Sequence, residues 1–169
     1  CPLCQSKMRE LGTNSVEDLQ AYLITRMGQF LNQHGRQLVG WDEVIAGDLS
    51  KNTTVMVWRG TNRAHEAIKH GYDVVLSPTS HCYFDLYQDA PALQLPAFTG
   101  YIPLEKVYSY VPGGDLPEAE RNLVTGVQGN LWTEHVATTE HVEQMLWPRG
   151  MALAEIGWNG TPKKNYTEF

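Results

Sequence analysis

The chain has 169 residues, of which 42% are hydrophobic and 19% charged, and its formal net charge is −6 at pH 7. This size and composition are typical of an ordinary globular protein with a single core. The acidic balance argues against binding to nucleic acid or to an anionic membrane surface, and no apolar run is long enough to span a bilayer. The sequence begins at Cys1 without a signal peptide, so we expect it to start at a processing site or at the boundary of an excised fragment.

The first predicted element is a helix over residues 15–34. Ser15 can cap this helix, with Asp18 at the spacing of a capping box, and Gly35 provides the stop. An apolar stripe recurs along it at helical spacing: Leu19, Tyr22, Leu23, Met27, Phe30 and Leu31.

Strands alternate with helices in the next part of the chain. A short helix is predicted over 62–70, capped by Asn62 and ended by Gly71. Alternating strands and helices favour a parallel sheet. Four short apolar runs are predicted to be its strands, at 37–41, 54–58, 73–77 and 126–132.

The remaining segments are less regular. Residues 78–122 are rich in proline and turn signals and predict a long, functional loop. A last helix is predicted over about 138–156, with a kink at Pro148, followed by a flexible tail over 159–169.

Four strands with their helices are about half of a TIM (β/α)8 barrel, which typically takes about 250 residues. The alternatives are a small open sheet that is complete by itself, or an excised fragment. A half barrel leaves its first and last strands with unpaired edges, so we also expect self-association.

Large rings and carboxylates follow the predicted strands, where parallel barrels place their sites. Residues two apart in an extended segment point the same way, and rings beside carboxylates suit the apolar face and the hydroxyls of a sugar. The alternatives are packing roles for the rings and solvated positions for the carboxylates. The candidate residues are Trp41, Trp58, Tyr83, Asp85, Trp132 and Glu134.

The three cysteines give a weaker signal. Cys1 and Cys4 have the C-x-x-C spacing of a zinc knuckle or a redox pair, but no second pair follows. We therefore expect a local loop with free or paired thiols and no metal site. Cys82 could be a nucleophile only if a base activated it, and the only candidate base beside it in the sequence is His81.

Several motifs together resemble the second half of the catalytic barrel of glycoside hydrolase family 20, the β-N-acetylhexosaminidases. Any one of them alone is weak, but they occur in the family's order over nearly the whole chain. They are Gly40-Trp41-Asp42-Glu43, Val57-Trp58-Arg59-Gly60, Tyr83-Phe84-Asp85, Gly126-Val127-Gln128-Gly129-Asn130-Leu131-Trp132-Thr133-Glu134, Trp147-Pro148-Arg149, Ala152-Leu153-Ala154-Glu155 and Trp158.

The resemblance implies strands five to eight of the barrel and a retaining hydrolase without an enzyme nucleophile, in which the substrate's acetamido oxygen attacks the anomeric carbon. An Asp–Glu pair in a His-x-Gly-Gly-Asp-Glu motif orients the acetamido group and supplies the general acid and base. This chain lacks that motif, so we expect the isolated chain to be inactive. Asp42-Glu43 is an adjacent acidic pair, but its place in the strand-five motif favours a supporting or helix-start role.

The resemblance also implies a role for each candidate residue. Tyr83 donates its hydroxyl to the acetamido oxygen, and the carboxylates of Asp85 and Glu134 accept hydrogen bonds from the 4- and 6-hydroxyls. The aromatic walls around the acetamido group are Trp41, Trp58 and Trp132. Phe98 takes the place of a tryptophan that stacks on the leaving sugar in many members, whereas Trp147 and Trp158 are expected to pack.

The sequence therefore predicts part of an exo-acting β-N-acetylhexosaminidase that hydrolyses terminal GlcNAc or GalNAc and needs no cofactor. The expected partner is a glycan that ends in N-acetylhexosamine, in a periplasmic or secreted setting. Two alternatives remain, a non-catalytic module that binds amino sugars and a small metal or redox protein built on Cys1 and Cys4.

Overall fold

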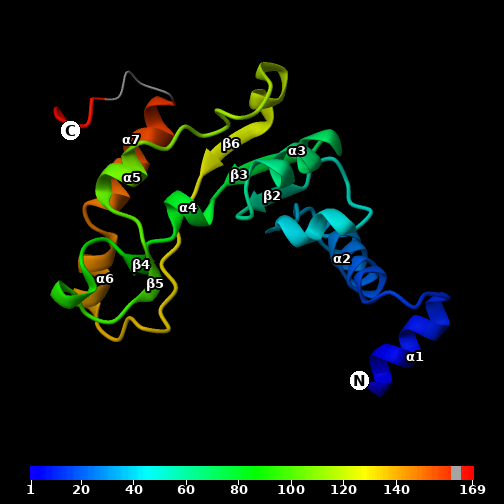
Figure 1. Cartoon of the computed structure of the whole chain (residues 1–169). Coiled ribbons are helices and arrows are strands. Elements are labelled where there is room, and N and C mark those ends of the chain that lie inside the picture. The colour runs from blue at the N-terminus through cyan, green and yellow to red at the C-terminus, as the bar shows by residue number, and fades with distance from the viewer. Residues whose placement is uncertain (161–164) are drawn as a thin grey trace.

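A computed structural model describes residues 1–160 and 165–169. A four-stranded parallel sheet lies at its centre, linked through α4 and β6 to a second group of short elements (Figure 1). The helices are α1 (Pro2–Leu11), α2 (Val16–Gln33), α3 (Thr61–Lys69), α4 (Thr79–Cys82), α5 (Leu104–Tyr108), α6 (Thr139–Leu146) and α7 (Arg149–Asn159), and the 3-10 helices are η1 (Asp42–Ala46), η2 (Pro91–Leu93) and η3 (Glu118–Leu123). The strands are β1 (Val39–Trp41), β2 (Thr54–Val57), β3 (Asp73–Leu76), β4 (Leu86–Tyr87), β5 (Phe98–Tyr101) and β6 (Val124–Val127).

The central sheet has the order β1-β2-β3-β6, and every neighbouring pair is parallel. The four predicted strands are therefore confirmed, together with their parallel arrangement. The last strand is shorter than predicted, since β6 ends at Val127. Beyond it the chain still follows β3, because the Gln128 N–H donates to the Leu76 carbonyl at 3.0 Å and Asn130 forms an isolated bridge with Tyr83.

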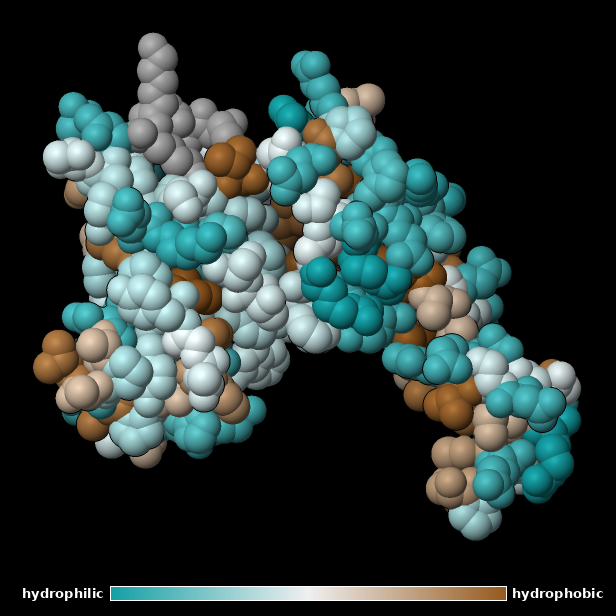
Figure 2. Space-filling model, viewed as in Figure 1, coloured by the Kyte–Doolittle hydropathy of each residue, from teal (hydrophilic) through white to brown (hydrophobic). Residues whose placement is uncertain are grey.

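The predicted cap of the long helix α2 is confirmed. Ser15 has extended backbone angles, and its hydroxyl accepts the Asp18 N–H at 3.1 Å. After α2 ends, Gly35 adopts a left-handed conformation with φ of 65°. The predicted apolar stripe is only partly buried, since Leu19, Tyr22 and Leu31 are half-buried. Leu23, Met27 and Phe30 are exposed, and Ile24, which is not part of that stripe, packs against the core. Figure 2 shows brown side chains on the surface at and beside α2.

Two predictions about helix starts are wrong. The segment that begins at Cys1 is not a loop, because α1 starts at Pro2 and Cys1 is its N-cap. Proline suits the first turn of a helix, where its missing N–H is not needed. Asn62 does not cap α3 and instead lies inside the helix, whose N-cap is Gly60 at φ of 103°. This positive φ favours glycine over asparagine at the turn from β2 into α3.

The sequence predicted a long loop over residues 78–122. The structure instead has a series of short elements there, from α4 to η3. Strands β4 and β5 pair in parallel and form a small separate sheet. These elements are only two to six residues long, so they carry too few side chains to show a helical or strand period in the sequence.

The last predicted helix is two helices. It breaks between α6 and α7 at the cis peptide bond Trp147–Pro148. The packing predicted for the two tryptophans here is wrong, because Trp147 is 49% exposed and Trp158 is 89% exposed.

A flexible tail was predicted over residues 159–169. Part of this segment, residues 161–164, lies outside the described residues. Among the described tail residues, Phe169 stacks on Tyr108 with ring centroids 4.4 Å apart.

Two hydrophobic clusters hold the elements together. The first lies between the central sheet and the helices that cover it, with Val55, Val57 and Val74 almost fully buried. The second joins α4, α5 and α7 around Phe84. The described helices include none with the length and apolar character needed to cross a membrane.

Candidate functional site

The predicted aromatic residues meet at the carboxyl edge of the central sheet. Trp41 is the last residue of β1, and Trp58 directly follows β2. The rings of Trp41 and Trp132 lie 6.1 Å apart, centroid to centroid, at an interplanar angle of 44°. A concave surface with a volume of about 340 Å³ lies among them, lined by Trp41, Glu43, Trp58, Tyr83 and Trp132. The structure thus brings all three predicted tryptophans and Tyr83 together.

A second concavity of about 390 Å³ adjoins the first, since Tyr83 and Trp132 line both. It contains the two predicted carboxylates, Asp85 and Glu134, and also Phe98. Phe98 packs edge-on against His135 at a centroid distance of 4.6 Å. The six predicted site residues therefore border two adjoining open depressions that share Tyr83 and Trp132, here together called the aromatic groove.

The two carboxylates of the aromatic groove differ in their surroundings. Glu134 is exposed, whereas Asp85 is only 6% exposed. The Asp85 Oδ1 atom is buried and has no hydrogen-bond partner among the described residues. Burial, with a smaller contribution from Glu134, raises the pKa of Asp85, while its own backbone N–H and Arg149 oppose this shift. A buried acceptor without a donor is costly, and a ligand hydroxyl would relieve that cost.

Arg149 holds the segment around Asp85 in place. Its guanidinium is fully buried and donates to the carbonyl oxygens of Phe84 at 2.6 Å, Leu86 at 3.0 Å and Ile102 at 3.0 Å, and also to the Met145 carbonyl at 2.6 Å. Burial lowers the pKa of Arg149 to about 10, although Asp85 counteracts this. One cation thus joins the ends of α6 and α7 to the backbone on both sides of Asp85.

Tyr83 is fixed through its backbone to the chain after β6. The Phe84 N–H donates to the Asn130 carbonyl at 2.6 Å, and the Asn130 N–H donates to the Cys82 carbonyl at 2.7 Å. The Asn130 amide also donates to the Ser77 hydroxyl at 2.7 Å. These bonds tie the segment carrying Tyr83 to the segment that leads to Trp132.

The pKa of the Tyr83 phenol is raised, chiefly because the group is partly buried. A hydrogen bond with Trp132 lowers this pKa, and the nearby carboxylates of Asp85, Asp42 and Glu43 raise it. The phenol is therefore held in its protonated form, which can donate a hydrogen bond to a ligand.

The adjacent acidic pair has the supporting role that the sequence favoured. Asp42 is fully buried and forms an ion pair with Arg59, and it accepts the backbone N–H groups of Trp58 and Arg59 at 3.2 Å each. Asp42 also begins the 3-10 helix η1. Because its oxygens are occupied by these donors, Asp42 is unsuited to proton transfer with a ligand.

Sequence reasoning missed the contribution of Glu43 to the groove wall. Its carboxylate accepts the Trp58 indole N–H at 3.2 Å and 3.4 Å, and Arg59 lies 3.8 Å from it. The adjacent acidic pair was the signal in the sequence that could have indicated it. Which member of the pair faces the groove depends on the 3-10 helix η1, and a helix of five residues is too short to show a helical period in the sequence. Glu43 therefore orients the indole of Trp58.

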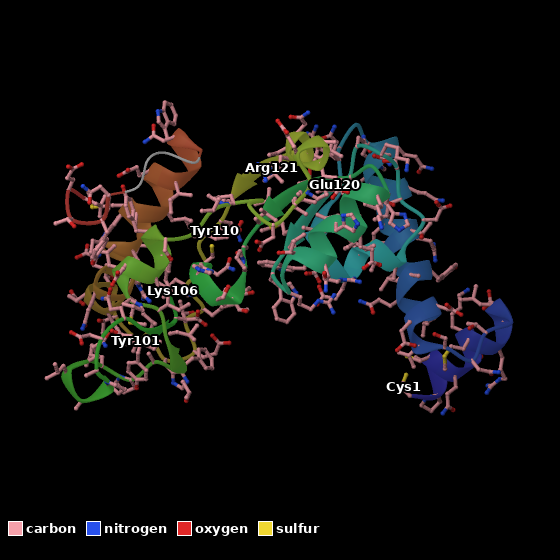
Figure 3. All side chains as sticks on the ribbon, turned by 45° about the horizontal axis from the view of Figure 1, so that its top comes forward. Cys1, Tyr101, Lys106, Tyr110, Glu120 and Arg121 are labelled. Carbon is pink, nitrogen blue, oxygen red and sulfur yellow. The ribbon has the colours of Figure 1, made fainter. Side chains whose placement is uncertain are left out.

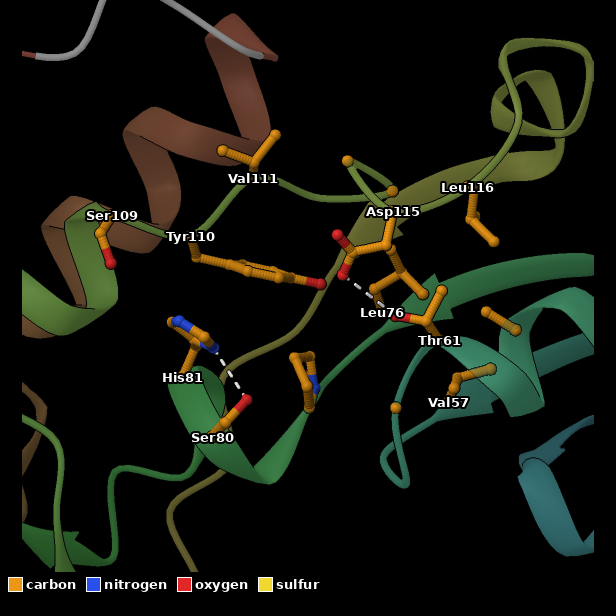
Figure 4. A pocket seen from close by; sticks show the side chains of 15 residues that line it. Val57, Thr61, Leu76, Ser80, His81, Ser109, Tyr110, Val111, Asp115 and Leu116 are labelled. Atoms are coloured by element: carbon orange, nitrogen blue, oxygen red, sulfur yellow. Dashed lines mark hydrogen bonds between the residues drawn. The ribbon is translucent and has the colours of Figure 1, made fainter.

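A more enclosed cavity of about 290 Å³ lies away from these residues, between the start of α3, α4 and the segment 109–116. Tyr110, labelled in Figure 3, reaches across it above His81, and the two rings stack at 5.0 Å (Figure 4). The Thr61 hydroxyl donates to Asp115 at 3.3 Å on the opposite side. This cavity contains none of the predicted site residues.

The cysteines form no metal site within the part of the chain that the structure describes. No group of three or more histidine, cysteine or acidic side chains there is arranged to hold a metal ion. Cys82 is buried, and burial raises the pKa of its thiol to about 12. A thiol with so high a pKa is a poor nucleophile at neutral pH.

The chain is similar in sequence to several known proteins. The family model "Glycosyl hydrolase family 20, catalytic domain" matches residues 1–161. A β-hexosaminidase of Porphyromonas gingivalis is 39% identical over 171 residues, which covers 100% of this chain and 22% of that protein. A β-hexosaminidase of Vibrio furnissii is 35% identical over 160 residues, covering 92% of this chain and 26% of its own length.

Solved structures give the same result. An exo-β-N-acetylglucosaminidase of Vibrio harveyi in complex with N-acetylglucosamine matches with a TM-score of 0.87 and 31% identity, over 99% of this chain and 27% of that one. The chain thus spans about a quarter of the length of these relatives. The match of the family model over nearly all its residues shows that the chain belongs to glycosyl hydrolase family 20, whose catalytic domain is a TIM barrel.

Proposed function

We propose that this chain is the second half of the catalytic barrel of an exo-acting β-N-acetylhexosaminidase, that it binds the terminal sugar, and that its four central strands are strands five to eight of that barrel. The observation that carries the proposal is the aromatic groove, in which three tryptophans, a protonated tyrosine and two carboxylates from distant parts of the chain meet. The family membership and the names of the relatives support the choice of substrate.

Each group in the groove has a chemical task in this proposal. The indole rings of Trp41, Trp58 and Trp132 enclose the acetamido group and exclude water from it. The Tyr83 hydroxyl donates to the acetamido oxygen and holds it in line with the anomeric carbon, where it is the nucleophile. This donation requires a protonated phenol, in agreement with the raised pKa of Tyr83.

The carboxylates select the terminal sugar. Asp85 is buried, and one of its oxygens has no partner among the residues that the structure describes, so it gains the most from accepting a hydroxyl of the ligand. Glu134 lies at the exposed rim of the same depression and accepts a second hydroxyl. We assign these acceptors to the 4- and 6-hydroxyls of N-acetylhexosamine.

The general acid and base are not among the groups of the aromatic groove. Asp42-Glu43 is the only Asp–Glu sequence in the chain, and Asp42 is neutralised by Arg59. We therefore propose that the 169-residue chain binds the sugar but does not cleave it, and that the catalytic pair is supplied by a His-x-Gly-Gly-Asp-Glu segment outside these residues. A standalone module that only binds amino sugars is the alternative.

Tryptophan fluorescence tests the binding proposal directly. N-acetylglucosamine should change the emission of the chain, and glucose should bind more weakly because it lacks the acetamido group. Trp132→Ala should abolish the response, whereas Trp158→Ala is a matched control because that side chain is 89% exposed and lies outside the groove. Equal responses to both sugars, or loss of the response only in the control variant, would refute the assignment.

The presence or absence of the His-x-Gly-Gly-Asp-Glu motif in a longer protein distinguishes the hydrolase hypothesis from the hypothesis of a binding module. A polypeptide that contains both the motif and this chain should release a chromogenic phenol from its N-acetylglucosaminide, and the 169-residue chain should not. Sugar binding without turnover in both polypeptides would favour the binding module.

A further inference from the structure

The C-x-x-C pair at the start of α1 takes no part in the proposed function. Cys1 is the N-cap of α1, and its Sγ atom lies 3.2 Å from the Sγ atom of Cys4. The Cys4 backbone N–H donates to the Cys1 Sγ at 3.4 Å. Both side chains are free thiols and are exposed, at the outer end of the molecule where Figure 3 labels Cys1.

The first turn of α1 keeps the two thiols together. Residues three apart lie on the same side of a helix, and Pro2 fixes one of the backbone angles between them. The Gln5 N–H donates to the Cys1 carbonyl at 3.1 Å and closes the turn. A disulfide bond needs a sulfur–sulfur distance of about 2.0 Å, which side-chain rotation can supply from the observed 3.2 Å without unwinding the helix.

A structural metal ion fits this place less well than a disulfide. Structural zinc sites use four ligands, whereas this pair supplies two. In the two described stretches, 1–160 and 165–169, no histidine or acidic side chain completes such a set. The chemistry that two adjacent, accessible thiols can perform without further ligands is thiol–disulfide exchange.

We propose that Cys1 and Cys4 form a thiol–disulfide exchange site that accepts a small disulfide of the oxidised glutathione class. One cysteine, as the thiolate, attacks a sulfur of the small disulfide and forms a mixed disulfide, and the first small thiolate leaves. The second cysteine then attacks the mixed disulfide, forms the Cys1–Cys4 bond and releases the second small thiolate. The chain loses two electrons, the small disulfide is reduced, and the two cysteine protons end on the two released thiols.

Cys82 provides an internal comparison for this proposal. It is fully buried within the second hydrophobic cluster, which also contains Phe84 and Ile102. An attacking disulfide cannot reach it without unfolding, and its raised thiol pKa disfavours the reactive thiolate. Exchange should therefore stop after one intramolecular disulfide and leave one free thiol.

Mass spectrometry of the folded chain tests the proposal. After treatment with excess oxidised glutathione, the intact mass should fall by two hydrogens and one thiol should remain for alkylation. Trypsin should release residues 1–7 as one peptide, since Lys7 follows both cysteines and Cys82 lies elsewhere. That peptide should carry the internal disulfide.

Two variants make the result decisive. In Cys82→Ser, the thiols of Cys1 and Cys4 should be oxidised as readily as they are in the parent chain. In Cys4→Ser, the reaction should stop at a stable glutathione adduct on Cys1. A persistent adduct in the parent chain, or modification of Cys82 in preference to the pair, would overturn the proposal. So would a loss of helical circular dichroism on oxidation, because the observed turn should accommodate the bond. None of these readouts depends on sugar binding, so they remain valid if the proposed function is wrong.

Discussion

The guanidinium of Arg149 donates to the two carbonyl oxygens that flank Asp85 along the chain, those of Phe84 and Leu86. A buried cation thus fixes the backbone of a buried acid, although the two side chains form no ion pair within the described residues. This arrangement leaves an Asp85 oxygen unpartnered at the groove while its main chain is held rigidly. Rigid placement of an acceptor is what selective recognition of a hydroxyl requires.

Arg149→Met should strongly destabilise the chain, because it removes the donor from four carbonyl groups at once. We expect the free energy of unfolding to fall by about 3 kcal/mol or more, as measured by urea denaturation. Arg149→Lys should recover only part of the loss, since an ammonium lacks the planar fork of donors. Arg36→Met, at an exposed position, should change little. A small effect of Arg149→Met would contradict the role of Arg149 in holding the backbone around Asp85.

Asp85→Asn should stabilise the chain and weaken sugar binding at the same time. The folded-state pKa of Asp85 is raised, so its ionised form is disfavoured by folding, and its contribution to stability is lost as the pH rises through that pKa. The variant should therefore unfold at higher urea than the parent at pH 7, and the difference should shrink as the pH falls towards about 4, the ordinary value for an aspartate.

Binding of N-acetylglucosamine by Asp85→Asn should weaken about tenfold or more, because a charge-assisted hydrogen bond is lost. Asp48→Asn, on an exposed side chain, is the matched control for both effects. A destabilised Asp85→Asn variant with unchanged affinity would show that Asp85 has a structural role instead.

Much of the architecture could be predicted from the sequence, because helix caps and strands depend on residues that are close together along the chain. Ser15 and Gly35 define the limits of α2, and the apolar runs define the central strands with their order. That the candidate site residues lie close together could be predicted because the carboxyl ends of neighbouring parallel strands meet in space. Arg149 could not, since its partners Phe84 and Ile102 lie more than 40 residues away along the chain and the contacts are to backbone atoms.

Tyr83→Phe should mainly lower kcat in a polypeptide that also supplies the Asp–Glu pair. The hydroxyl matters most when the acetamido oxygen becomes the nucleophile, so its loss should cost on the order of 10²-fold in kcat with a smaller change in KM. Tyr101→Phe, at an exposed tyrosine, is the control. An unchanged kcat in a folded Tyr83→Phe variant would remove this residue from the mechanism.

The 169-residue chain should self-associate through the exposed face of α2. Leu23, Met27 and Phe30 are all exposed there, and a second copy of the chain can cover them. Light scattering should report a mass above that of the 19.0 kDa monomer, and Met27→Lys combined with Phe30→Lys should lower it. A monomeric parent chain with a sharp cooperative melt would show that the central sheet and its helices form a sufficient core alone.

The most direct test of the aromatic groove is a crystal structure of the chain with N-acetylglucosamine. The account predicts the acetamido group between Trp41, Trp58 and Trp132, with its oxygen within hydrogen-bond distance of the Tyr83 hydroxyl and sugar hydroxyls at Asp85 and Glu134. Density for the sugar in the cavity beside Tyr110 instead, or a sugar in the groove with its acetamido group turned out to solvent, would contradict the account.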